Sequence, residues 1–244
     1  MPSGFDAPKS IVALMDTTYW GRKFGVVTIK DHLSGHVLWR KFIDRKERVE
    51  DYVEGVRWLE EKRHVTVVGV VSDGLRGLKE RLSPRLFQLC QFHQIKSVKR
   101  KLTSKPKLEA SREFLDLVRF MTKTDKASFI GLLGEWEAKW KDFLGERSIG
   151  PDGKSHYAHK RLRSAYLSVK RNMPSLWTFE DHYGSGIPNT NNGIESLFTE
   201  VKRILRLHKG LSMSRRKLLI SGLLNAHSPY RTGAGDEIGS KNDT

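Results

Sequence analysis

The segment VTVVGVVSD, residues 65–73, places the strongest constraint on the fold of this 244-residue chain. Its apolar residues are β-branched except for one glycine, and they lack the polar alternation of a half-exposed strand. Such a run is typical of a β-strand that is covered on both faces. Helices on both sides of a sheet give that cover, so the segment predicts an α/β fold.

The segments around this strand predict the rest of the sheet. Three strand-like segments precede it, and a helical repeat of apolar residues at 49–63 separates them from it. A short helix is expected at 75–82. The expected strands span residues 11–16, 23–31, 36–43, 65–73 and 85–92. This order is that of a ribonuclease H-like mixed five-stranded sheet flanked by helices, in which a right-handed crossover makes the fourth strand parallel to one of the first three.

Beyond this region the pattern becomes helical. Residues 93–186 contain helical segments such as FIGLLGEWEAKWKDFL and show no convincing strand. We predict three parts: a ribonuclease H-like core that begins at 11–92, an all-helical insertion at 93–186, and the last core helices at 187–226. The ends, residues 1–10 and 231–244, are expected to be disordered tails.

The composition narrows the choice of partner and compartment. The 44 Lys and Arg residues exceed the 28 Asp and Glu residues, which gives a formal net charge of +16. This excess favours a polyanion, most simply nucleic acid, although a basic protein without such a partner remains an alternative. A single cysteine, Cys90, excludes an internal disulfide and a zinc finger of the Cys-pair type. The chain has no apolar run of the roughly 18 residues that span a membrane and no secretory signal pattern, so we expect a cytoplasmic, nucleoid-associated protein.

Two aspartates follow apolar runs. Asp16 ends IVALMD and Asp73 ends VTVVGVVSD, so both are expected at the ends of adjacent parallel strands. Two carboxylates placed there repel each other, and a hard divalent cation such as Mg²⁺ or Mn²⁺ removes that repulsion. The alternative is local: Asp73 as a helix N-cap and Asp16 as a turn residue. The pair, together with a third acid in a basic protein, favours the metal site.

Glu195 is the candidate third acid. It lies in the first turn of a helix expected to open near Asn191, at the edge of the apolar stripe that contains Ile194, Phe198 and Val201. Glu200 points away from that stripe. Glu195 is therefore expected beside the sheet, although by itself it could be an ordinary first-turn acid that complements the helix dipole.

The ordered set of motifs resembles the DDE transposases of the Mutator superfamily, including bacterial insertion-sequence members. The resemblance rests on Asp16 in MDTTYWG, Asp73 in VSDGLRGL, the pair Cys90 and His93 in CQFH, and Glu195 in NTNNGIES. The closing segment is the most specific match, because it combines an Asn-rich entry, the glutamate and a basic stretch. The separation of Asp73 and Glu195 resembles that of members with a helical insertion before the last acid.

The resemblance implies a catalytic domain in which Asp16, Asp73 and Glu195 hold two Mg²⁺ ions, with Mn²⁺ as a substitute. The implied reaction is cleavage of DNA at transposon ends and joining to a target by in-line phosphoryl transfer, with a homodimer as the expected assembly. It gives His93 a role in orienting a catalytic carboxylate or contacting a phosphate, while Cys90 could equally be a buried strand residue. A nuclease without strand transfer and a truncated relic that only binds DNA are the alternatives.

One departure from the family concerns end recognition. Members carry a DNA-binding region before the first aspartate, whereas 15 residues precede Asp16. We therefore expect recognition of element ends to lie outside this catalytic region.

Basic residues gather in two places, after CQFH and after Glu195, where residues 201–217 include no acid. A solvated helix face would normally mix acids with the bases, so a DNA-backbone track is the favoured interpretation. The residues expected to contact DNA are Lys96, Lys99, Arg100, Lys101, Lys202, Arg203, Arg206, Lys209, Arg215 and Arg216. Trp177, in a loop-like segment, is the candidate for stacking on an unpaired or flipped base.

Overall fold

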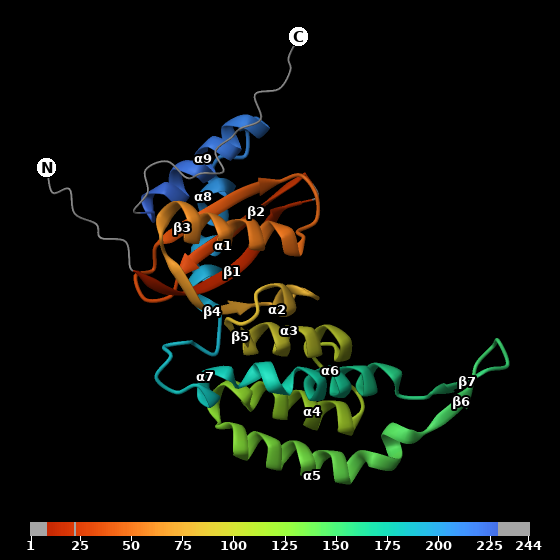
Figure 1. Ribbon diagram of the computed structural model, residues 1–244. Helices are drawn as coiled ribbons and strands as arrows, with labels where there is room; N and C mark the ends of the chain where they lie inside the picture. The colour runs from red at the N-terminus through yellow and green to blue at the C-terminus, as the bar shows by residue number, and fades with distance from the viewer. Residues whose placement is uncertain (1–8, 22, 229–244) are drawn as a thin grey trace, which may run out of the picture. The chain divides into compact units, whose positions relative to one another are not determined.

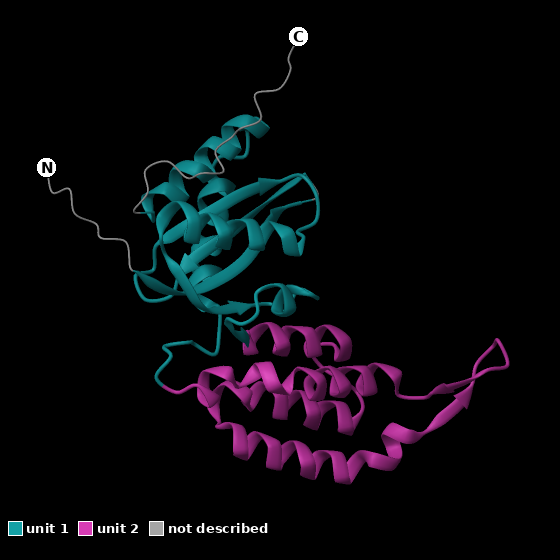
Figure 2. Cartoon of the chain, in the orientation of Figure 1, with its two compact units in different colours: residues 1–88, 184–244 teal, residues 89–183 magenta. Residues whose placement is uncertain are grey.

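The structure is a computed structural model that describes residues 9–21 and 23–228 (Figure 1). The expected tail at 231–244 lies outside these residues, as does all but the last two residues of the tail at 1–10. The chain divides into two compact units (Figure 2). We call residues 1–88 with 184–244 the sheet unit and residues 89–183 the helical unit.

The elements follow one another in the order given by their numbers. The strands are β1 Ser10–Trp20, β2 Phe24–Asp31, β3 Val37–Ile43, β4 Thr66–Ser72, β5 Leu86–Leu89, β6 Arg147–Ile149 and β7 Ser155–Tyr157. The helices are α1 Val49–Arg63, α2 Leu78–Arg81, α3 Gln91–Leu102, α4 Glu109–Phe120, the 3-10 helix η1 Met121–Lys123, α5 Lys126–Gly145, α6 Lys160–Leu176, α7 Thr178–Asp181, α8 Asn192–Leu207 and α9 Met213–Ala226.

Five strands form one mixed sheet in the order β3-β2-β1-β4-β5. β1 pairs antiparallel with β2 and parallel with β4, and β2 pairs antiparallel with β3. The chain passes through α1 between β3 and β4, as parallel pairing requires a crossover. The predicted fold class, an α/β protein with a ribonuclease H-like strand order, is confirmed.

Strand β4, which lies between β1 and β5, is less uniformly covered than its sequence predicts. Val67, Val70 and Val71 are at most 2% exposed, but Val68 is 42% exposed. The strand is therefore half-exposed where it begins and covered on both faces from Gly69 onward. A Cβ on Gly69 would lie 2.7 Å from Cδ1 of Ile187, so the glycine lets the segment before α8 pack directly on the strand.

Helices cover both faces of the sheet in this unit (Figure 1). On one face α1 packs so closely that a Cβ on Gly55 would lie 2.5 Å from Cδ1 of Ile29. On the other face α8 and α9 bury an apolar cluster with β2 and β3. Its buried members are Phe24, Val26, Val37, Leu197, Val201, Leu205, Ile220 and Leu224. The apolar stripe predicted for α8 is thus the surface that fixes this helix on the sheet.

The helical unit has its own aromatic core. The rings of Phe114 and Trp136 lie 4.5 Å apart, and both rings pack against that of Tyr166. Trp177 is 0% exposed and packs against Phe129 and Phe179. The prediction that Trp177 stacks on a base is therefore wrong, because its indole is buried in the core against the rings of Phe129 and Phe179.

Two boundaries in and beside the helical unit also differ from the predictions. β5 ends at Leu89 and α3 begins at Gln91, so the segment CQFH opens a helix and does not complete a strand. The loop around GPDGKSH closes a two-stranded hairpin, β6 with β7, in a region predicted to be all-helical. Within the described ranges, no helix combines the length and the apolar character needed to cross a membrane.

Candidate metal centre

Asp16 lies within a strand, which corrects the prediction that it ends one. β1 continues to Trp20, and Asp16 pairs with Thr28 of β2. The parallel pairing of β1 with β4, however, stops earlier, with Leu14 opposite Val71. At Asp16, β1 is therefore paired with β2 on one side and no longer paired with β4 on the other. The pairing with β2 extends β1 beyond the end of the apolar run.

Asp73 follows β4 directly and is exposed. Continuing the register from Leu14 and Val71 by two residues sets Asp73 opposite Asp16. The local alternative for Asp73 is wrong, because the next helix, α2, begins at Leu78 with Gly77 as its N-cap. The other alternative, Asp16 as a turn residue, is also wrong, because Asp16 lies within β1 and pairs with Thr28 of β2.

Glu195 is brought to this point by the start of α8. The side-chain amide of Asn191, the residue before the helix, donates a hydrogen bond to the carbonyl of Met15 at 3.0 Å. Nζ of Lys30 donates to the carbonyl of Gly193 at 2.9 Å, which ties the same turn to β2. The first turn of α8 is thereby anchored beside the residue that precedes Asp16. The Asn-rich entry seen in the sequence acts as this anchor.

The two carboxylates meet as a result. An oxygen of Asp16 and an oxygen of Glu195 lie within 4.8 Å of each other. Glu195 is half-buried whereas Glu200, on the same helix, is exposed, as the apolar stripe predicts. Oxygen ligands at this spacing suit one hard cation between them.

The electrostatics of Asp16 show a strained group. Burial raises the pKa of Asp16 to about 7, and repulsion from Asp73 is the next largest cause, followed by smaller contributions from Glu195 and Glu47. The N–H of Thr17 donates to Oδ1 at 2.8 Å and opposes the rise. The charged groups that act most on Asp16 are therefore all acids, which is the condition under which a divalent cation binds.

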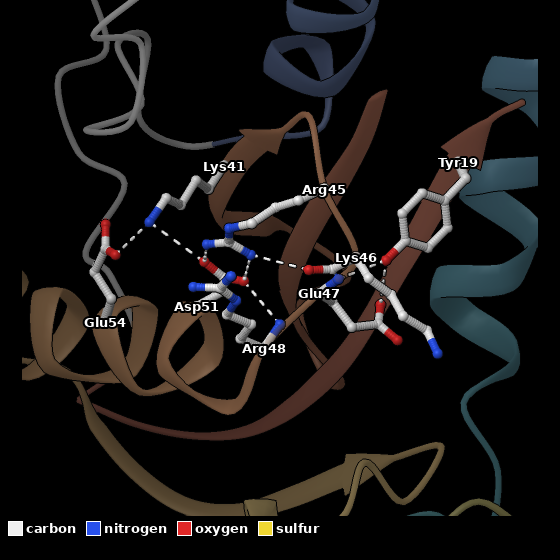
Figure 3. Close-up of polar contacts among 8 residues, drawn as sticks. All are labelled: Tyr19, Lys41, Arg45, Lys46, Glu47, Arg48, Asp51 and Glu54. Atoms are coloured by element: carbon white, nitrogen blue, oxygen red, sulfur yellow. Dashed lines mark hydrogen bonds and ion pairs between the residues drawn. The ribbon is translucent and has the colours of Figure 1, made fainter. Parts of the chain in front are cut away.

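A second buried aspartate of the sheet unit is in the opposite state (Figure 3). Asp51 accepts two hydrogen bonds of 2.8 Å from the guanidinium of Arg45, and Nζ of Lys41 lies 3.4 Å away. Burial alone would raise the pKa of Asp51, but the bonds from Arg45 and from the N–H of Arg48 hold it below its usual range. The protein thus neutralises Asp51 with its own cations and leaves Asp16 among acids.

Glu47 is a fourth acid that sequence reasoning missed. Its carboxylate accepts a hydrogen bond from the Tyr19 hydroxyl at 3.2 Å, and its N–H donates to the same oxygen at 2.8 Å (Figure 3). Burial raises the pKa of Glu47, and the charge of Asp73 adds to the rise. In the sequence Glu47 sits in the polar run DRKERVED, where nothing distinguishes it from its neighbours.

Cys90 and His93 belong to the helical unit. Cys90 is fully buried and in no disulfide, and it is the N-cap residue of α3. Its burial suits the structural interpretation. His93 lies half-buried in the first turn of α3, and its proposed role stays a prediction from the resemblance.

The basic residues predicted to contact DNA occur in both units. In the helical unit Lys96, Lys99 and Arg100 are exposed on α3, while Nζ of Lys101 donates to the carbonyl and the hydroxyl of Ser164. In the sheet unit Lys202, Arg206, Lys209 and Arg216 line one groove. Arg203 and Arg215 are exposed near it in sequence. Contact of these residues with DNA stays a prediction.

The fold and the acids together define the class: a ribonuclease H-like α/β protein with an acidic group that could hold a metal ion. No protein-family model matches the chain, and a search of curated proteins gave no match. The class therefore rests on the strand order and on the close approach of the Asp16 and Glu195 carboxylates.

Proposed function

We propose that this protein is a metal-dependent polynucleotidyl transferase of the DDE transposase type that cleaves DNA at transposon ends and joins it to a target. One observation carries the proposal: Asp16 is held partly buried among Asp73, Glu195 and Glu47, with a pKa near 7. A protein that needed these acids only for stability would gain by replacing one with a neutral side chain. Such a cluster is typical of a functional site.

The donor set fits the expected cofactor. Asp16, Asp73 and Glu195 would hold the ions, and all three offer hard oxygen atoms, which Mg²⁺ and Mn²⁺ prefer. Two ions held there would activate the attacking hydroxyl and stabilise the leaving oxygen of an in-line displacement. The chain supplies the fixed positions: β1 and β4 hold the aspartates, and the Asn191 anchor holds the first turn of α8.

The finer parts of the proposal rest on the resemblance and the charge. The net charge of +16 supports a DNA substrate, and joining of ends would require two active sites, for which a homodimer is the simplest assembly. A relic that only binds DNA would be free to lose its acids, and Asp16, Asp73 and Glu195 are all present. A transposase and a nuclease would carry the same acids, so the experiment has to distinguish these two activities.

The test is Mn²⁺- or Mg²⁺-dependent nicking of DNA by the full chain. We expect Asp73→Asn and Glu195→Gln to lower the nicking rate by about a hundredfold or more, because each removes a metal ligand. Glu200→Gln is the matched control, since it makes the same change five residues along α8 on an exposed side chain. Equal nicking by all four proteins would contradict the triad.

A second arm separates the two enzymatic alternatives. Pre-cleaved DNA with a free 3′-hydroxyl is offered with a supercoiled target, and joined product is scored. Joining that requires Asp73 supports the transposase, whereas nicking without joining supports the nuclease. His93→Ala in the same assay tests the role that the resemblance gives to this histidine.

A further inference from the structure

A groove of about 430 Å³ lies in the sheet unit beyond the acids and combines aromatic with cationic side chains. The residues that carry the argument are Trp20, Lys202, Arg206, Lys209 and Arg216. Its size is that of a pocket for one small organic group, not of a surface for a duplex.

The aromatic wall is held in place by packing. The ring of Trp20 stacks on that of Phe24 with centroids 5.1 Å apart, and Phe24 belongs to the buried cluster under α8. Tyr19, the preceding residue of β1, points to the opposite face of the sheet, where its ring lies against Gly25 and its hydroxyl is bonded to Glu47. The ring of Trp20 is therefore ordered before any ligand binds, which lowers the entropic cost of stacking.

The cationic wall is built from α8, the following loop and α9. Lys202 and Arg206 lie one turn apart on α8. The guanidinium of Arg216 donates to the carbonyl of Lys209 at 2.7 Å and to that of Leu211 at 3.0 Å, which fixes the loop against α9. Because residues 201–217 include no acid, four positive groups share one groove. An anion that enters it would relieve their repulsion.

Both elements lead from the acids to the groove. Asp16 and Trp20 are four residues apart on β1, so they share a face of the sheet and lie roughly 13 Å apart along the strand. Glu195 and Lys202 are seven residues apart on α8, roughly 10 Å along the helix. At 3.4 Å of rise per nucleotide, the groove lies about three or four nucleotides from a phosphate at the acids.

We propose that this groove holds an unpaired nucleotide of the DNA strand that is cut, with the base against Trp20 and the phosphates against the cations. The inference rests on the proposed function for its choice of DNA. Duplex DNA presents phosphates but no free base face, so the aromatic wall would serve nothing on a fully paired substrate. Unpaired nucleotides offer both groups, and stacking on aromatic side chains together with a cationic track is how single strands are bound.

The experiment measures binding without metal, so that no cleavage occurs. In EDTA, the full chain is titrated against a labelled duplex that is either blunt or extended by a short 3′ single strand carrying 2-aminopurine. We expect tighter binding of the extended DNA by about tenfold, together with quenching of the 2-aminopurine by the aromatic wall.

Variants locate the effect. Arg206→Gln and Lys209→Gln change surface charges and should each weaken binding of the extended DNA severalfold, and Trp20→Leu should abolish both the preference and the quenching. Arg57→Gln, an exposed cation on α1, is the matched control. If thermal unfolding shows that Trp20→Leu does not fold, the affinities of the two charge variants and the quenching by the wild type still test the proposal.

Two results would overturn the inference. One is equal affinity for blunt and extended DNA. The other is equal competition by inorganic polyphosphate without quenching, which would mean an anion site only. Because the assay contains no metal, its outcome is independent of nicking. If the extended DNA is bound selectively but the acid variants nick normally, the groove proposal stands and the triad is contradicted. If binding is not selective but the acid variants fail to nick, the triad stands and the groove proposal is contradicted.

Discussion

The two units treat their carboxylates differently. In the helical unit the acids pair with lysines: Oε1 of Glu113 lies 2.6 Å from Nζ of Lys139, and Oε1 of Glu137 lies 3.0 Å from Nζ of Lys170. These pairs join neighbouring helices at exposed positions and add little stability each. In the sheet unit Asp16 lies among acids and its pKa rises to about 7. An acid that the protein neutralises itself serves the structure, whereas an acid that it leaves among other acids could hold an external cation.

Asp51 sharpens this comparison because it lies in the same unit and, at 1% exposed, is more buried than the half-buried Asp16. Arg45 and Lys41 neutralise Asp51, and its carboxylate also accepts the N–H of Arg48 at the start of α1. We therefore expect removal of the charge to change the free energy of unfolding in opposite directions at the two aspartates.

The largest effect is expected for Asp51→Ala. The change leaves Arg45 without its partner and removes the cap of α1, so it should lower the free energy of unfolding by about 3 kcal/mol. Urea denaturation followed by circular dichroism measures it. Glu54→Gln, which removes the other, exposed partner of Lys41, is the control and should change stability by less than about 1 kcal/mol. A small loss of stability in Asp51→Ala would show that the ion pair with Arg45 does not stabilise the fold, which would contradict the contrast with Asp16.

For Asp16→Asn we expect the opposite sign. Without metal at pH 8 the variant should be more stable than the wild type by roughly 2 kcal/mol, because the buried charge and its repulsion are gone. Mn²⁺ should raise the melting temperature of the wild type and leave that of the variant almost unchanged.

The pH dependence gives an independent check on Asp16. Its pKa is raised from 3.8 to about 7 on folding, so the folded state binds the proton more tightly than the unfolded state. The stability that protonation confers is complete below pH 3.8 and is lost as the pH rises to about 7. The difference between Asp16→Asn and the wild type should therefore be near zero at pH 4 and constant above pH 8. A difference that does not vary with pH would contradict the raised pKa.

The last comparison sets a glycine of each unit side by side, and the smallest effect is expected for the one in the helical unit. A Cβ on Gly55 would meet Ile29 at 2.5 Å and Trp39 at 2.7 Å, so Gly55→Ala should destabilise the sheet unit by roughly 1–3 kcal/mol. On α5 of the helical unit, Gly134 has no atom within 4 Å of that position, and Gly134→Ala should stabilise by about 0.5–1 kcal/mol. Thermal unfolding of both variants tests the signs, and the same sign for both would refute the packing argument.

The fold could be predicted in large part from local patterns. The apolar run at 65–73, the strand segments before it and the helical repeat at 49–63 each mark one element, and α1 spans the predicted residues. The boundary between β5 and α3 could not be found in this way. CQFH is apolar enough for a strand, and the packing of the following helix decides its state.

The candidate site was predictable where an acid follows an apolar run or, as for Glu195, lies beside the apolar stripe of a helix. Asp16 and Asp73 were identified on the first of these patterns, although β1 continues past Asp16 because β2 still pairs with it. Glu47 gave no signal, because its link to the cluster is a contact with Tyr19 across 28 residues of chain. Trp177 gave a misleading one, because the polar residues around it in sequence are not its neighbours in space.

The sequence by itself determined the order and type of the sheet elements, the basic charge and the identity of three acids, because periodicity and composition are local properties. Only the tertiary structure decided that Asp16 lies among acids while Asp51 lies among cations. The pKa of Asp16 depends on Asp73 and Glu195, which β4 and α8 bring close from distant parts of the chain. The pKa of Asp51 depends on Arg45 and Arg48, which precede it by a few residues and reach it because the chain turns there into α1. The groove beside Trp20 arose in the same way, because its aromatic wall and its cationic wall are separated by about 180 residues of sequence and meet only when α8 packs on β1.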